Sequence, residues 1–186
     1  MGPIICLQPA APNYDALPTY KITYYPLEKR DYMPYAQAQV CLTPAQLVVR
    51  MWAFEAFPRP DSRLEAVFAA PDGGRLLIPW VRADGAFGCL CRAGGRDKNL
   101  DCLAHAVEGE DLQGVYWGIA IALDRDLADR ELGRGALREG GVLPGNFYKL
   151  SDDPDKPHQG AMAPTDFTGG RRYAPDALTP FQIVRY

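Results

Sequence analysis

Trp80, Arg82 and Asp84 form a group of side chains that is well suited to binding a sugar. The indole of Trp80 can stack on the C–H face of a pyranose ring, and charged neighbours can hydrogen-bond the ring hydroxyls. The alternative is that Trp80 packs in a core, because aromatic side chains supply much of the buried area of a protein. These residues alone leave both interpretations open.

A pair of one cysteine and one histidine is the second chemistry that the residue types allow. The chain has two histidines, His105 and His158, and five cysteines. Neither histidine lies in a metal-ligand spacing such as H-E-x-x-H, and the motifs of serine hydrolases and phosphate-binding loops are absent. The five thiols are predicted to be reduced and buried, since free cysteine behaves as a small hydrophobe. They are Cys6, Cys41, Cys89, Cys91 and Cys102.

Three carboxylates lie close together at Asp152, Asp153 and Asp155. Calcium takes oxygen ligands of this kind, but the segment lacks the glycine hinge and the distal glutamate of an EF-hand loop. We therefore predict a solvated acidic turn here, and no metal or other cofactor, with calcium as the open alternative.

The composition is that of an ordinary globular protein. Of 186 residues, 47% are hydrophobic and 23% are charged, and the net charge of −3 predicts no nucleic-acid partner. No apolar run approaches the ~18 residues of a membrane helix, so no membrane partner is predicted. The opening segment MGPIICLQPAAP does not resemble a signal peptide, which predicts a cytoplasmic protein. The length favours one domain, residues 1–186.

Eighteen glycines and 17 prolines divide the chain into short segments, which is typical of an all-β fold. Turns at 71–74 and 83–85 separate predicted strands as hairpin turns do. Asp124 to Leu137 is the one stretch with helical character. In the strand after Val115, the large side chains Trp117, Ile119 and Ile121 share one face and are predicted to be core. The predicted strands are 20–25, 36–42, 46–57, 63–69, 75–82, 86–91, 103–107, 115–123 and 181–186.

The segment from Leu143 to Phe167 is predicted to be a long polar loop with a compact block at its start, Asn146-Phe147-Tyr148-Lys149. Asn146 can hydrogen-bond local backbone groups, and Tyr148 can bury its ring while its hydroxyl stays paired. We predict that both residues tie this loop to the fold.

The order of these blocks resembles the family 9 carbohydrate-binding modules and their stand-alone bacterial relatives. Residues 61–68, DSRLEAVF, are similar to the D-S-x-V-E-x-x-F strand of that family, and residues 80–85 to its next hairpin. Residues 117–127 resemble its W-x-x-E-I-x-I-P strand and the turn after it. Residues 146–149 match the N-F-Y-K block, and Pro157-His158 matches the P-H that follows. The resemblance extends from about residue 20 to the C-terminus.

The resemblance implies a β-sandwich of jelly-roll type, with two mostly antiparallel sheets and a long C-terminal loop excursion. It also implies a sugar groove at Glu65, Trp80, Arg82 and His158, near Asn146 and Tyr148. The chain departs from the family at Met162, where a second aromatic plate is expected, and at Gly118, near the expected acidic residue. The competing interpretation of the groove is that Glu65 and Arg82 pair with each other across neighbouring strands.

We therefore predict a non-catalytic domain like those that bind carbohydrates, with a mono- or oligosaccharide as its ligand and a site that is weakened or lost. A structural or protein-interaction domain with a decayed ligand site is the first alternative. A small hydrolase that uses a Cys/His pair is the second. An exposed aromatic ring beside arginine and glutamate would favour sugar, and a Cys–His hydrogen bond would favour the hydrolase.

Overall fold

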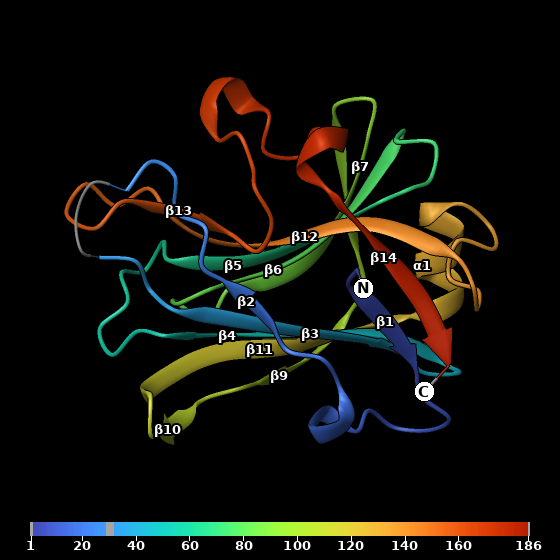
Figure 1. The fold of residues 1–186 in the computed structure, drawn as a ribbon, viewed down its shortest axis with the longest axis horizontal. Coiled ribbons are helices and arrows are strands. Elements are labelled where there is room, and N and C mark those ends of the chain that lie inside the picture. Colours follow the sequence, from blue (N-terminus) through green and yellow to red (C-terminus); the bar gives the residue numbers. More distant parts are fainter. Residues whose placement is uncertain (1, 29–31, 186) are drawn as a thin grey trace.

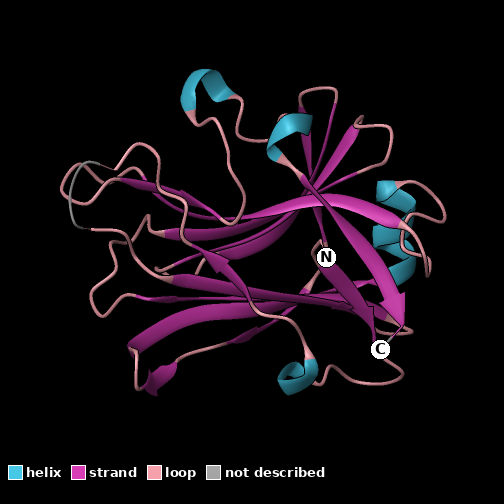
Figure 2. Ribbon diagram, in the orientation of Figure 1, coloured by secondary structure: helices cyan, strands magenta, loops and turns pink. Residues whose placement is uncertain are grey.

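The computed structural model describes residues 2–28 and 32–185. Fourteen strands within these residues form one hydrogen-bonded sheet that curls into two layers (Figures 1 and 2). The strands are β1 (Ile4–Leu7), β2 (Tyr20–Ile22), β3 (Ala36–Leu42), β4 (Gln46–Phe54), β5 (Arg63–Ala69), β6 (Arg75–Arg82), β7 (Phe87–Ala93), β8 (Arg96–Leu100), β9 (Leu103–Ala106), β10 (Gly109–Asp111), β11 (Gly114–Asp124), β12 (Val142–Ser151), β13 (His158–Ala161) and β14 (Thr179–Arg185).

The lower layer in Figure 1 contains β2, β3, β4, β9, β10 and β11, and the upper layer contains β5 to β8, β12 and β13. The predicted all-β sandwich is confirmed. The layers are continuous because β1 pairs in parallel with both β3 and β14, and β14 pairs antiparallel with β12. The two sheets expected from the sequence are thus joined along one side into a single sheet, and the jelly-roll connectivity stays a prediction.

The main core fills the space between the two layers. Phe68, Phe147 and Phe181 contact one another edge to face in its centre, with ring centroids 5.8–6.3 Å apart. Ile119 and Ile121 are buried there, as predicted. Trp117 differs from the prediction, because it is only partly buried and packs at the edge of this core. A polar cluster occupies that edge, and the indole nitrogen of Trp117 needs a partner in it.

The predictions for β3, β5 and β6 match the observed bounds, and both predicted hairpin turns are present. In these turns Gly73 and Gly85 have φ angles of 69° and 89°, which other residues rarely adopt. The helix α1 (Arg125–Leu132) lies within the predicted stretch. Asp124 caps it, because its Oδ1 accepts a hydrogen bond from the backbone nitrogen of Leu127 at 2.8 Å.

The prediction of a loop beginning at Leu143 is wrong. Residues 142–151 form a central strand, β12, which pairs with β5, β13 and β14. Phe147, Tyr148 and Lys149 are all fully buried. The side chains of a strand alternate between faces, so Phe147 and Lys149 point into the sandwich, whereas Asn146 and Tyr148 point outward.

A long connection, residues 162–178, leads from β13 to the last strand and is called the excursion below. It contains two single helical turns, Thr168–Gly170 and Pro175–Ala177, and lies over the upper layer in Figure 1. This confirms the predicted excursion before a final strand. The outer face of the upper layer is therefore partly covered, with Phe167, Tyr173 and Leu178 packed on it. No described helix is long and apolar enough to span a membrane.

Candidate functional site

Five predicted site residues lie on the outer face of the upper layer, and four of them are neighbours there. Tyr148 on β12 is the direct cross-strand partner of Glu65 on β5, and Glu65 is in turn the partner of Trp80 on β6. Directly paired residues point to the same side of a sheet. Arg82, two residues after Trp80, shares that side. This surface is called the Trp80 face below.

Trp80 lies against Gly88, its cross-strand partner on β7. A Cβ atom added at Gly88 would come 3.3 Å from the indole Nε1, so the glycine makes room for the ring. The ring is half-buried, but Nε1 itself is buried and has no hydrogen-bond partner within the described residues. A buried donor without a partner is rare in proteins. The indole N–H thus needs an acceptor that the described chain does not supply.

The Glu65 carboxylate receives several donors from the sheet and from the excursion. Arg63 Nε lies 2.8 Å from Oε1, and Arg172 Nη2 lies 3.6 Å from Oε2. The hydroxyl of Tyr173 donates a short hydrogen bond to Oε2. Arg172 Nε is buried and, like Trp80 Nε1, has no partner in the described part of the chain. The excursion therefore brings a phenol hydroxyl and a guanidinium to the acidic group of the Trp80 face.

Arg82 is exposed and pairs with Asp84, whose Oδ2 lies 2.7 Å from its Nη2. The alternative in which Glu65 pairs with Arg82 across the sheet is wrong, because Glu65 uses Arg63 and Arg172 instead. Arg82 lies directly opposite Arg63 on β5. It therefore stands at the solvent-facing edge of the Trp80 face.

Asn146 and Tyr148 hold the excursion on the upper layer, which confirms their predicted role as ties. Asn146 Nδ2 donates to the carbonyl oxygen of Ala177 at 2.8 Å and to Oγ1 of Thr165 at 3.0 Å. The hydroxyl of Tyr148 donates to the carbonyl oxygen of Arg172 at 2.7 Å. Both side chains are fully buried. Their predicted contact with a ligand stays a prediction, and in this structure they act by positioning the excursion.

The structure does not bring His158 to the Trp80 face. His158 is paired with Ser151 on β12, so its side chain points into the sandwich, and its exposure is 3%. The ring Nε2 lies 2.7 Å from Lys149 Nζ, and Nδ1 lies 2.8 Å from the carbonyl oxygen of Lys156. Since a carbonyl only accepts, we assign the proton to Nδ1. Both nitrogens are occupied, so His158 is not at the rim of the predicted groove.

Lys149 and His158 belong to a buried polar cluster that the sequence did not reveal. Lys149 Nζ lies 3.1 Å from Oε2 of Glu55 and donates a short hydrogen bond to Ser62. Trp117 Nε1 donates to the same Glu55 oxygen at 3.2 Å. One signal could have revealed this cluster: Lys149 stands in an otherwise apolar run, after Phe147 and Tyr148 and before Leu150. A lysine that is buried with such neighbours requires an acidic partner.

Burial and pairing shift the pKa values in this cluster. Burial lowers the pKa of Lys149 to about 8, although Glu55 opposes the shift. Burial also lowers the pKa of His158 to about 4, and the positive charge of Lys149 adds to it. Burial acts to raise the pKa of Glu55, but Lys149 and hydrogen bonds from Tyr32 and Ser62 outweigh it and leave the pKa below its usual value. The cluster therefore holds an ion pair beside a neutral imidazole at pH 7.

The geometry offers no support for the Cys/His hydrolase. Four of the five thiols are buried, as predicted, and Cys102 is half-buried. Burial raises the pKa of each thiol, which disfavours the reactive thiolate. His158 is occupied by Lys149 and Lys156, and His105 is exposed on β9.

The three carboxylates of the acidic turn pair with arginines. Asp152 lies 3.3 Å from Arg63, and Asp155 lies 2.7 Å from Arg59, which is also 3.6 Å from Asp153. Within the described residues, no group of three or more histidine, cysteine, aspartate or glutamate side chains could hold a metal ion.

Met162 does not stand on the Trp80 face either. Its side chain packs against the main core, and its backbone nitrogen donates to the carbonyl oxygen of Phe147 at 2.9 Å. The residue of the excursion that brings an aromatic ring to Glu65 is Tyr173. A tryptophan at position 162 would therefore enter the core and would not restore a second stacking plate.

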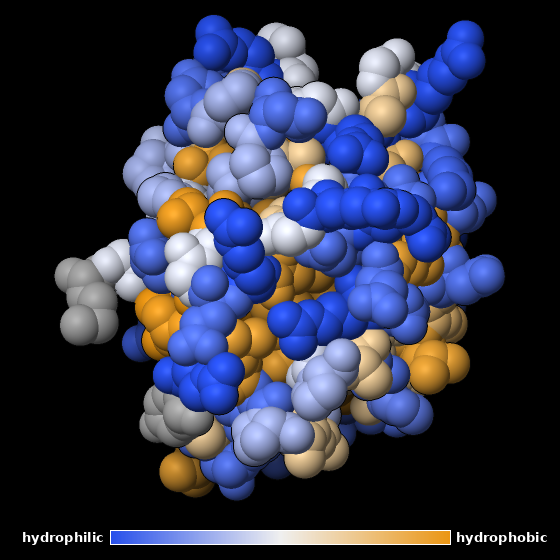
Figure 3. All heavy atoms as spheres, turned by 90° about the vertical axis from the view of Figure 1, so that its right-hand side faces the viewer, coloured by the Kyte–Doolittle hydropathy of each residue, from blue (hydrophilic) through white to orange (hydrophobic). Residues whose placement is uncertain are grey.

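A groove of about 470 Å³ lies at the end of the molecule that carries α1 and the end of β14. Leu7, Pro9 and Pro44 provide apolar walls, and Arg138 and Arg185 stand at its rim. Figure 3 shows this end, with apolar surface framed by hydrophilic side chains. None of the predicted site residues lines this groove.

No protein-family model matches the chain, and no curated protein sequence matches it. Solved structures do match. A candidate carbohydrate-binding protein from Bacteroides uniformis has a TM-score of 0.72 at 12% identity, covering 98% of this chain and 100% of its own. A family 9 carbohydrate-binding module from Caldicellulosiruptor kristjanssonii, in complex with cellotriose, has a TM-score of 0.63 at 12% identity, covering 98% and 94%.

A structure of a family 9 module from the same organism in complex with glucose has a TM-score of 0.61 at 11% identity. It covers 100% of this chain and 93% of its own. The chain therefore has the fold of the family 9 carbohydrate-binding modules, as the resemblance of its sequence blocks implied. At these identities the likeness concerns the fold.

Proposed function

We propose that the chain binds a carbohydrate on the Trp80 face and catalyses no reaction. The observation that carries the proposal is a pair of buried donors without partners, Trp80 Nε1 and Arg172 Nε, on two residues that neighbour Glu65. Trp80 is the cross-strand partner of Glu65, and Arg172 Nη2 lies 3.6 Å from its Oε2. A sugar hydroxyl both accepts and donates hydrogen bonds. One hydroxyl can accept from Arg172 and donate to Glu65, and another can accept from the N–H at the edge of the Trp80 indole.

The excursion must move for this binding to occur. Both donor nitrogens are buried, and Tyr173 already donates its hydroxyl to Glu65. A sugar hydroxyl on Glu65 replaces that phenol hydroxyl, so part of the binding free energy is spent in displacing Tyr173. The site is therefore weak, in keeping with the absence of a second indole plate. Arg82, exposed at the edge, supplies a further donor for an outer hydroxyl.

A second candidate function rests on the same contact. If Tyr173 and Arg172 hold Glu65 permanently, the Trp80 face is closed and the chain is a structural or protein-interaction domain with a decayed sugar site. The two functions differ in one observable, which is whether a sugar releases Tyr173 from Glu65.

Calorimetric titration tests the proposal. Two structural neighbours were solved with cellotriose and with glucose, which makes glucose and cello-oligosaccharides the first ligands to examine, with xylose and xylobiose as comparison. We expect saturable binding by the wild type, and weaker binding with fewer sugars bound per chain in Trp80→Ala. Trp52→Ala, at a half-buried tryptophan on β4 of the other layer, serves as the control. Binding that is equal in wild type and Trp80→Ala would refute the proposed site.

A further inference from the structure

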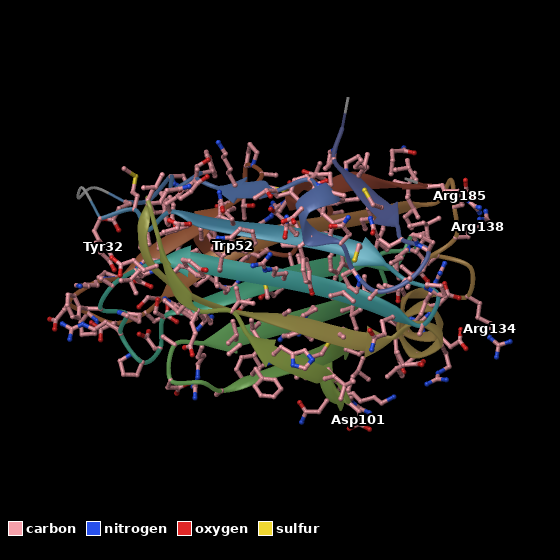
Figure 4. All side chains as sticks on the ribbon, turned by 90° about the horizontal axis from the view of Figure 1, so that it is seen from below. Tyr32, Trp52, Asp101, Arg134, Arg138 and Arg185 are labelled. Atoms are coloured by element: carbon pink, nitrogen blue, oxygen red, sulfur yellow. The ribbon has the colours of Figure 1, made fainter. Side chains whose placement is uncertain are left out.

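A second groove, called the end groove below, has a volume of about 320 Å³ and lies at the end of the sandwich where β4 finishes. Its lining includes Tyr32, Tyr35, Phe54, Glu55, Phe57 and Lys156. Figure 4 shows Tyr32 at the opposite end of the molecule from Arg138 and Arg185. No residue of the end groove belongs to the Trp80 face.

Four aromatic side chains line the end groove, namely Tyr32, Tyr35, Phe54 and Phe57. Tyr35 and Phe54 stack with their ring centroids 5.7 Å apart and their planes at 24°. Phe57, in the turn after β4, is 83% exposed. A phenylalanine so exposed gains nothing from burial in the core, and exposed aromatic surface beside a groove is typical of a ligand-binding site.

Tyr32 is held in place by three contacts. Its hydroxyl donates to Oε1 of Glu55 at 2.5 Å. Its ring meets the edge of His158 with centroids 5.6 Å apart, and Lys156 Nζ lies 5.0 Å from the ring centroid. Glu55 is itself fixed by its ion pair with Lys149. Glu55 therefore joins the buried cluster to the lining of the groove and orients Tyr32 before any ligand arrives.

Polar groups stand between the aromatic walls. The hydroxyl of Tyr35 accepts a hydrogen bond from Gln37 Nε2 at 2.6 Å, which leaves its own proton for another acceptor. The ammonium of Lys156 supplies further donors at the rim. Rigid rings with a few fixed donors match a sugar, whose C–H faces stack on aromatic rings while its hydroxyls take hydrogen bonds. A purely apolar ligand would leave the polar groups unpaired.

We propose that the end groove is a second carbohydrate-binding site, which takes a mono- or disaccharide between Phe57 and the Tyr35–Phe54 pair. The groove volume is at the lower end of the range for small-ligand sites, roughly 300–1,000 Å³. The site rests on its own residues and does not require the Trp80 face to bind.

Calorimetric titration of glucose, cellobiose and xylobiose into Trp80→Ala protein isolates the end groove from the Trp80 face. We expect saturable binding of at least one of these sugars. Adding Phe57→Ala should weaken that binding roughly ten-fold or more, on the scale of a lost stacking partner. Because Phe57 is exposed, its replacement should not change the melting temperature. An unchanged melting temperature would show that the double variant is folded.

The matched control is Trp80→Ala with Phe87→Ala. Phe87 is 47% exposed on β7 of the other layer, and its removal should leave the affinity unchanged. The proposal is overturned if Trp80→Ala binds none of the three sugars, or if the Phe57 and Phe87 variants bind equally. It is also overturned if Phe57→Ala turns a dimer into a monomer without affecting sugar affinity, since the groove would then be a contact between copies. A different result would show that the Trp80 face binds no sugar: Trp80→Ala would then bind sugar as tightly as the wild type.

Discussion

Lys149 Nζ and Glu55 Oε2 lie 3.1 Å apart at the end of the core, with side-chain exposures of 0% and 4%. The ion pair is completed by Ser62 and Trp117, so the buried charges have several hydrogen bonds. A buried ion pair is weak evidence for stability, but removal of one partner leaves an uncompensated charge. The pair also explains why a lysine occurs in the middle of a buried strand.

Lys149→Met is expected to destabilise the fold by about 3–5 kcal/mol, because Glu55 remains buried without its counter-charge. Glu55→Gln leaves the ammonium unpaired and should also destabilise. The double variant should lose clearly less than the sum of the two single losses. Urea unfolding of the four proteins measures this coupling, and additive losses would show that the pair does not act as a unit.

Acid should destabilise the fold through His158. Its folded pKa, about 4, lies below the ordinary value of 6.5, so the unfolded chain binds the proton more readily. Stability is therefore fully present above pH 6.5 and is lost as the pH falls toward 4. We expect His158→Gln to remove about 2–3 kcal/mol of the difference in unfolding free energy between pH 7 and pH 4.

The other histidine provides the control for this pH effect. His105 is exposed on β9, and His105→Gln should keep the wild-type pH dependence. If His158→Gln retains the full loss of stability between pH 7 and pH 4, the buried imidazole is not its source. Carboxylates with lowered pKa values would then be the candidates, and Glu55 is the buried one among them.

Asn146→Ala should loosen the excursion. The substitution leaves the carbonyl oxygen of Ala177 and the hydroxyl of Thr165 without their donor, so we expect a loss of about 1–3 kcal/mol. Trypsin should cut faster after Arg171 or Arg172. Asn99→Ala, at an exposed asparagine on β8, is the control. Unchanged melting temperature and cleavage rate in Asn146→Ala would contradict the role of this residue as a tie.

Tyr173→Phe should strengthen sugar binding on the Trp80 face. The change removes the hydroxyl that occupies Glu65 but keeps the ring. If the phenol competes with the sugar hydroxyl, its removal should raise the affinity several-fold, since one hydrogen bond contributes about 1 kcal/mol. Calorimetry with cellobiose gives the answer. Weaker binding by Tyr173→Phe would mean that the hydroxyl contacts the sugar instead.

The sequence predicted the strands whose pattern is local. The bounds of β3, β5 and β6 follow from apolar alternation and from glycine turns, which depend only on neighbouring residues. It failed at β12, where Asn146 and Lys149 interrupt the apolar pattern. Their burial depends on partners far away in the chain, such as Ser62, which lies 87 residues from Lys149. Pattern reasoning has no access to such pairs.

The sequence likewise placed some residues of the candidate site correctly and missed or misplaced others. Glu65, Trp80 and Arg82 share one face because the spacing along two paired strands places them there, and a sequence motif can carry that spacing. The resemblance placed the loop that carries His158 beside them, but strand pairing turns its side chain to the inside. The contact of Tyr173 with Glu65 has no local signal, since it depends on the path of the excursion over the sheet.

The indole N–H resonance of Trp80 tests the central claim most directly. Each tryptophan has one indole N–H, and Trp80→Phe identifies the signal of Trp80 in a ¹H–¹⁵N spectrum. On titration with cellobiose, we predict a saturable shift of the Trp80 signal, because its unpaired N–H gains an acceptor, while the signal of Trp52 stays in place. An unmoved Trp80 signal at saturating cellobiose, glucose and xylobiose would contradict carbohydrate binding on the Trp80 face.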